Sequence, residues 1–237
     1  MNPAASANTF ACCGVSERSV WNKKVLDAQQ QQWQDMFLET PEMFGTEPSH
    51  PARKASELFK REGKTKVLEL GSGQGRDTLF FAQKGFTVHA LDYSNQAIEA
   101  INRMAHDLGL SQLIITKVHD VRNPLPFGHE TFDASYSHML FCMALTTAQL
   151  QFLSEEIRRV LKQGGISVYT VRHTGDAHYK TGIYRGEDMY EVGDFIVHFF
   201  SREKVELLAK GYEIIGIDEF EEGKLPRRLF LAMLRKK

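Results

Sequence analysis

The strongest constraint on the fold is an alternation of short apolar runs with stretches of helical period. The first five runs are residues 66–70, 87–91, 113–118, 132–137 and 166–171, and the helical stretches between them are 76–84, 95–108 and 146–162. Strands separated by helices pair in parallel, because each helix carries the chain back across one face of the sheet. We therefore expect an α/β fold, doubly wound, with a mostly parallel sheet and helices on both faces.

Two further apolar runs, 212–217 and 228–234, close the chain and differ from the first five. Only about ten residues separate them, and Gly223 and Pro226 lie among these. That connection is too short for a helical crossover, so the two runs predict an antiparallel hairpin. The complete expectation is a Rossmann-like sheet of seven strands with an antiparallel C-terminal hairpin.

The remainder of the chain divides into three parts. Residues 1–16 are small and polar without a period, which predicts a disordered leader. Residues 17–50 carry apolar side chains loosely at helical spacing and then a loop rich in proline. Residues 51–237 form the main domain, whose first helix opens at Pro51 and ends at Gly63.

Composition excludes several classes of function. A net charge of −1 and 42% hydrophobic residues are typical of one globular domain and not of a nucleic-acid-binding protein. No apolar run is long enough for a membrane helix, and we expect a cytoplasmic protein. Cys12, Cys13 and Cys142 fit neither a disulfide framework nor a zinc site, and no metal is expected. The oligomeric state stays open.

The stretch VLELGSGQG contains the residues most informative about a ligand. Gly71, Gly73 and Gly75 follow the first strand and open a helix, at the edge of the sheet where doubly wound folds bind ligands. Small residues there let a ligand approach backbone N–H groups. A dinucleotide fingerprint fails because Arg76 stands where its third glycine is needed. A P-loop fails because no Gly-Lys-Ser/Thr follows.

The pattern E/D-x-G-x-G-x-G resembles that of the class I S-adenosylmethionine-dependent methyltransferases. The resemblance implies that Glu69 lies near the ammonium of the donor's methionine part and that Asp92 binds both ribose hydroxyls. Asp120 is expected to meet the adenine amino group. The residues expected to bind S-adenosylmethionine are Glu69, Gly71, Ser72, Gly73, Gly75, Asp92, Tyr93, Asp120, Val121, Ser137, Trp33 and Phe44.

Within this family the stretch GRDTLFFAQKGFTVHALDYS and the ending EEGKLPRRLFLAMLRKK look like the small-molecule enzymes of the tellurite-resistance and thiopurine type. That likeness implies a small-molecule acceptor, such as a thiol or another chalcogen nucleophile. Methylation of arsenic, or of a small amine or carboxylate, is an alternative. A dinucleotide-dependent oxidoreductase and a non-catalytic nucleotide-binding module are more distant alternatives.

The acceptor site is expected near a long insert at about 172–200, since long connections after a strand are commonly functional. The catalytic candidates are His138, Arg172, His173 and His178, and the expected substrate-binding residues are His138, Phe141, Arg172, His173, His178 and Arg227. The alternative for each is ordinary hydrogen bonding in a loop. By analogy with the family, residues 17–50 would form a lid over the donor.

Overall fold

The computed structural model describes residues 23–223 and 227–237. The predicted leader at 1–16 and the first part of the predicted lid, 17–22, lie outside the described residues. Pro226, at the tip of the predicted hairpin, lies outside them as well.

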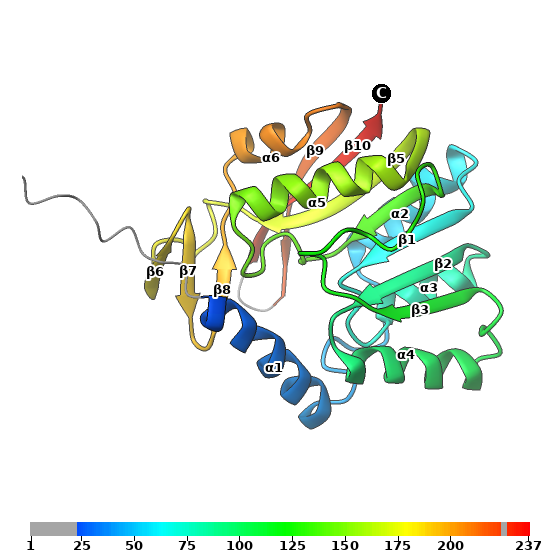
Figure 1. Ribbon diagram of the computed structural model, residues 1–237, viewed down its shortest axis with the longest axis horizontal. Coiled ribbons are helices and arrows are strands. Elements are labelled where there is room, and N and C mark those ends of the chain that lie inside the picture. The colour runs from blue at the N-terminus through cyan, green and yellow to red at the C-terminus, as the bar shows by residue number, and fades with distance from the viewer. Residues whose placement is uncertain (1–22, 224–226) are drawn as a thin grey trace, which may run out of the picture.

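The main sheet has seven strands, as predicted, and their order is β3-β2-β1-β4-β5-β10-β9. The first five strands pair in parallel, and β10 pairs antiparallel with both β5 and β9. Figure 1 shows the strands crossing the molecule as one twisted layer. The bounds are β1 Lys66–Leu70, β2 Thr87–Asp92, β3 Ile114–Val118, β4 Phe132–Ser137, β5 Leu161–Arg172, β9 Tyr212–Glu222 and β10 Arg227–Lys236.

Helices cover both faces of this sheet, and each face has its own core. On the face that we call the α3 side lie α2 His50–Arg61, α3 Arg76–Gln83 and α4 Asn95–Asp107, packed on residues such as Val67, Val88 and Leu231. On the opposite face, the α5 side, lie α5 Thr147–Val160 and α6 Arg202–Leu208, packed on Leu68, Val171 and Phe230. The doubly wound architecture is therefore confirmed.

Local sequence fixes where the helices start. The hydroxyls of Ser94 and Ser201 accept the N–H groups of Ala97 and Lys204 and cap α4 and α6. Thr146 caps α5 through a capping box with Gln149. Because these caps directly follow strands or their loops, each chain reversal is set at the edge where a ligand is expected.

The insert after β5 contains a small sheet that the sequence pattern did not reveal. Its antiparallel strands are β6 Ile183–Gly186, β7 Met189–Val192 and β8 Phe195–His198. Four-residue strands joined by tight turns have too little alternation to stand out in the sequence. Helix α1, Lys23–Glu39, lies beside β8 (Figure 1), where the Trp33 and Phe195 ring centroids are 4.7 Å apart.

Candidate active site

The glycine turn after β1 is tightly packed on two sides. Gly71, Gly73 and Gly75 have φ values of 68°, 51° and 91°, in the region that favours glycine. A Cβ atom on Gly71 would lie 3.0 Å from Leu140 Cβ, and one on Gly75 would lie 2.6 Å from Ile101 Cγ1. Side chains are thus excluded there, and the turn presents bare backbone at the carboxyl edge of the sheet.

Glu69 is a buried carboxyl next to this turn. It is 3% exposed and accepts a hydrogen bond of 2.6 Å from Thr78 Oγ1. Burial, and then the nearby charge of Asp77, raise the pKa of Glu69 to about 8. A cation beside the carboxylate would favour its charged form. The ammonium of an amino-acid ligand therefore fits the place that the sequence assigns to it.

Asp92 ends β2 and contacts the turn from the other side. Its Oδ2 accepts the Gly73 N–H and its Oδ1 accepts the Ser94 N–H, both at 2.9 Å. Burial raises the pKa of Asp92 to about 6, although these N–H groups act in the opposite direction. A carboxylate offers about four lone-pair positions, so two hydroxyl donors can still be accepted.

Two buried hydroxyls at this edge have no hydrogen-bond partner within the described part of the chain. They are Ser72 Oγ, in the glycine turn, and Ser137 Oγ, at the end of β4. Buried polar atoms are normally paired, so an unpaired one at a sheet edge points to a polar ligand. Both serines are among the residues that the sequence predicted for the cofactor.

The polar residues expected near the adenine, unlike Ser72 and Ser137, already have hydrogen-bond partners within the protein. The Asp120 carboxylate binds the guanidinium of Arg122, with Nη2 and Oδ2 2.6 Å apart. Burial raises the pKa of Asp120, but the hydrogen bonds from Arg122 lower it further, so the net shift is downward. Val121 is buried, and the Tyr93 carbonyl accepts a hydrogen bond of 3.0 Å from Gln30 on α1. The adenine contact of Asp120 stays a prediction.

Helix α1 and the loop after it form the described part of the predicted lid, which we call the lid segment, residues 23–49. Its aromatic side chains lie over the glycine turn, because a Cβ atom on Gly73 would be 3.7 Å from Phe37 and 4.0 Å from Phe44. The rings of Trp33 and Phe44 are 6.3 Å apart. Trp33 and Phe44 therefore lie together near the turn, and their contact with the donor stays a prediction.

Gln74, which is not among the predicted site residues, joins the lid segment to the turn. Its Nε2 donates to the carbonyls of Phe37 and Thr40, at 3.2 and 3.0 Å, and its Oε1 accepts the Met43 N–H at 2.9 Å. The neighbouring Arg76 donates to the Phe44 carbonyl at 3.1 Å. Gln74 stands at an x position of the pattern E/D-x-G-x-G-x-G, so the pattern itself gave no signal for this role.

His138 follows β4 and lies next to the turn. Its Nδ1 is 2.8 Å from Thr170 Oγ1, and its Nε2 is 3.3 Å from Glu222 Oε2 at the end of β9. The predicted substrate residue Arg227 is exposed and pairs across the hairpin with Glu222. Phe141, in contrast, is 1% exposed and stacks on Tyr169 in the core of the α5 side, so contact with an acceptor stays a prediction.

The remaining candidates lie apart from His138. Arg172 Nη2 is 2.5 Å from Asp176 Oδ1 and 3.0 Å from His178 Nδ1, and the Arg172 and Asp176 side chains are 7% and 1% exposed. Asp176 also accepts the Arg228 N–H, which ties the insert to β10. In the described structure Arg172 and His178 thus stabilise the base of the insert. This is the alternative considered for each candidate, ordinary hydrogen bonding within a loop.

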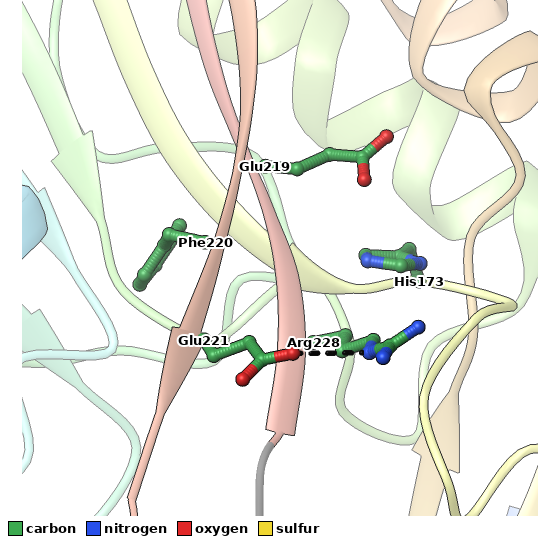
Figure 2. A pocket seen from close by; sticks show the side chains of 5 residues that line it. All are labelled: His173, Glu219, Phe220, Glu221 and Arg228. Atoms are coloured by element: carbon green, nitrogen blue, oxygen red, sulfur yellow. Dashed lines mark hydrogen bonds and ion pairs between the residues drawn. The ribbon is translucent and has the colours of Figure 1, made fainter.

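His173 lines a separate pocket. It stacks on Phe230, a core residue of the α5 side, with centroids 4.6 Å apart. Figure 2 shows it facing Glu219 and Arg228, while Glu221 binds Arg228. The pocket measures about 230 Å³ and is lined by His173, Glu219, Phe220, Glu221 and Arg228. The sheet therefore lies between His173 and the pair formed by His138 and Glu222.

Two properties of the described residues bear on other classes of function. No group of histidine, cysteine and acidic side chains there could hold a metal ion. Within the same ranges, no helix combines the length and apolar character needed to cross a membrane.

The strand order, the glycine turn after β1 and the acid at the end of β2 together define the class I methyltransferase fold. Residues 67–165 match the methyltransferase domain family. Residues 67–165 are thus similar to a methyltransferase domain, which agrees with the class that the sequence resembles.

Known relatives agree with this assignment. An uncharacterised methyltransferase of Synechocystis sp. is 36% identical over 104 residues, which cover 43% of this chain and 44% of that protein. The matched part thus spans less than half of that relative.

Two solved structures share the fold. One is the 1,6-didemethyltoxoflavin-N1-methyltransferase of Burkholderia thailandensis, solved with its substrate and S-adenosylhomocysteine, at 17% identity and a TM-score of 0.68 over 91% of this chain and 88% of that one. The other is TehB of Haemophilus influenzae, at 18% identity and a TM-score of 0.65 over 86% of this chain and 67% of that one. At such identities the likeness establishes the fold.

Proposed function

We propose that this protein transfers a methyl group from S-adenosylmethionine to a small-molecule acceptor. The observation that carries the proposal is the edge at the glycine turn, where bare backbone, two unpartnered hydroxyls and two buried acids, Glu69 and Asp92, come together. Glu69 would bind the ammonium of the donor and Asp92 its ribose hydroxyls. The matched methyltransferase domain supports this choice of cofactor.

The donor supplies an activated methyl group on a sulfonium, and its leaving group is a neutral thioether. The protein therefore has to align the two reactants and exclude water, and alignment alone can contribute about 7–11 kcal/mol. The lid segment serves the second task, because Phe37 and Phe44 cover the turn at Gly73. Aromatic faces there also favour the positive charge of a sulfonium.

For the acceptor we propose a small molecule with a soft nucleophile, a thiol in the first place. The likeness of the fold to TehB and to a small-molecule N-methyltransferase supports a small acceptor. Among the sequence candidates, His138 has the position closest to the glycine turn, since Leu140 two residues later packs on Gly71. Arg227 lies beside it on the hairpin.

The proposal is tested by calorimetry and a turnover screen. S-adenosylmethionine and S-adenosylhomocysteine should bind, and NADH should not. Thiols, amines, carboxylates, selenite and tellurite are then offered with the donor, and formation of S-adenosylhomocysteine is measured. Binding of NADH without binding of either adenosyl ligand would refute the proposal and favour the oxidoreductase alternative.

A further inference from the structure

A histidine and a carboxylate from distant parts of the chain meet beside the glycine turn. His138 follows β4 and Glu222 ends β9, and their side chains are 13% and 28% exposed. Neither side chain is among the residues assigned to the donor. Both are thus accessible enough to contact an acceptor and buried enough to act on it in a partly dehydrated setting.

The hydrogen bonds around Thr170 determine which nitrogen of His138 carries the proton. Thr170 is fully buried, and its Oγ1 accepts the Met139 N–H at 3.0 Å. The Thr170 hydroxyl also has a proton to donate, and among the described hydrogen bonds the acceptor for this proton is His138 Nδ1, 2.8 Å from Oγ1. The hydroxyl therefore donates to Nδ1, and a neutral His138 carries its proton on Nε2, pointing at Glu222.

Within the described part of the chain, Glu222 hydrogen-bonds with His138 and lies near two cations, Arg76 and Arg227. Burial raises its pKa, but the hydrogen bond from His138 and the charges of Arg76 and Arg227 lower it below the usual value. Arg76 comes from the start of α3, directly after Gly75, and Arg227 from β10. Glu222 is thus ionised at neutral pH, and it interacts electrostatically with Arg76, the first residue of α3.

Resting on the function proposed above, we propose that Glu222 accepts the proton that the nucleophile loses and that His138, held by Thr170, positions it. The nucleophile attacks the methyl carbon, and the carbon–sulfur bond breaks with its electron pair left on sulfur. The proton of the nucleophile passes to the Glu222 carboxylate. The electron pair of the broken bond to hydrogen stays on the nucleophile. The sulfonium and carboxylate charges both disappear, and the acid then returns its proton to water.

This assignment defines the acceptor class more narrowly. The acceptor arrives with its nucleophile protonated, as a thiol, hydroxyl or N–H group, because a carboxylate can bind and deprotonate such a group. An anion such as tellurite would bring a second negative charge next to Glu222, and its nucleophilic chalcogen atom carries no proton to lose. Of the acceptors considered from the sequence, thiols fit and anionic chalcogen species do not.

The test compares Glu222→Gln with a matched control, Glu221→Gln. Glu221 is the preceding residue of β9 and pairs with Arg228, so its side chain lies on the opposite face of the sheet. With 2-mercaptoethanol, a phenol, a primary amine, selenite and tellurite as probes, wild type should methylate protonated nucleophiles. Glu222→Gln should lower kcat at least 100-fold and leave the donor Kd within twofold. Glu221→Gln should match wild type.

The role of His138 has its own measurement. In His138→Leu the carboxylate loses its hydrogen bond but keeps Arg76 and Arg227, so the pKa of Glu222 rises and the acidic limb of the kcat profile moves to higher pH. Long-range ¹H–¹⁵N NMR of the wild-type ring should show the proton on Nε2. A ring protonated on Nδ1, or an unmoved acidic limb, overturns the positioning role.

Failure of this inference differs from failure of the proposed function. If wild type turns over a probe and Glu222→Gln does so within twofold, Glu222 is not the proton acceptor, whereas methyl transfer stands. Turnover of selenite or tellurite alone also overturns the inference. If wild type binds no donor and methylates nothing, the proposed function fails, and with it the catalytic role of Glu222.

Discussion

Glu69 offers the sharpest test of the donor site, because its burial has opposite consequences for stability and for binding. The side chain is 3% exposed, and its pKa is raised from 4.5 to about 8. The folded protein therefore holds a proton that the unfolded chain loses. Stability must then fall as pH rises from 4.5 to 8, the window between the two pKa values.

The size of the effect follows from the width of this window. Each pKa unit is equivalent to about 1.4 kcal/mol, so at pH 7 the cost to the folded state is about 3 kcal/mol. Glu69→Gln removes the ionisable group and keeps an oxygen that can accept the Thr78 hydroxyl. We expect the variant without ligand to be more stable than wild type by about 3 kcal/mol at pH 7 and equally stable below pH 4.5.

The same substitution should weaken donor binding, because an amide cannot pair with an ammonium. In wild type, binding at pH 7 should release up to about one proton as Glu69 ionises beside the ammonium. Urea unfolding between pH 4.5 and 8 measures the change in stability. Calorimetry in buffers of different ionisation enthalpy measures donor affinity and the number of protons released on binding. Glu57→Gln, which removes an exposed carboxylate of α2, is the control. A variant with wild-type stability across this range would refute the reasoning.

Three further predictions concern the rest of the site. Asp92→Ala should weaken binding of S-adenosylhomocysteine by about 1.5–3 kcal/mol, the value of hydrogen bonds to a charged group, and calorimetry on the folded variant would detect it. Gln74→Ala removes the three hydrogen bonds to the lid segment, so hydrogen exchange of residues 37–44 should accelerate. Donor dissociation, measured by stopped flow, should become about tenfold faster. Unchanged hydrogen exchange would show that Gln74 does not hold the lid segment on the turn. Arg172→Met leaves Asp176 as an unpaired buried charge and should cost about 3–5 kcal/mol in urea unfolding, and Arg172→Met/Asp176→Leu should recover most of the loss.

The main sheet could be predicted from the sequence because its signals are local. Each strand is a short apolar run, and each helix begins at a capping residue that stands where the period changes, such as Ser94 or Thr146. The glycine turn is equally local, since three positive φ values require glycine whatever surrounds them. These elements therefore lie within a residue or two of their predicted places, apart from β5 and β9, which extend further.

Pairings between distant segments could not be predicted in the same way. The contact of Glu222 with His138 depends on the register of β10 between β5 and β9, which places Thr170 opposite Leu231 and Glu222 opposite Arg227. A pattern of single residues carries no register across a sheet. For the same reason the basic and aromatic insert suggested one cluster, although the structure divides its members between the Asp176 network and the pocket of His173.

The donor and acceptor halves of the candidate site are built from different elements, which bears on how the site achieves specificity. The donor half is built on rigid strand ends, with Glu69, Asp92 and the glycine turn fixed by the sheet. The half near His138 combines a strand end with the β9–β10 hairpin, and the lid segment closes over the turn through Gln74. A change of acceptor can then arise in the hairpin or the lid while Glu69 and Asp92, which lie on β1 and β2, stay in place. Substitutions at Glu222 should accordingly alter acceptor choice and kcat, whereas substitutions at Asp92 should alter donor affinity for every acceptor alike.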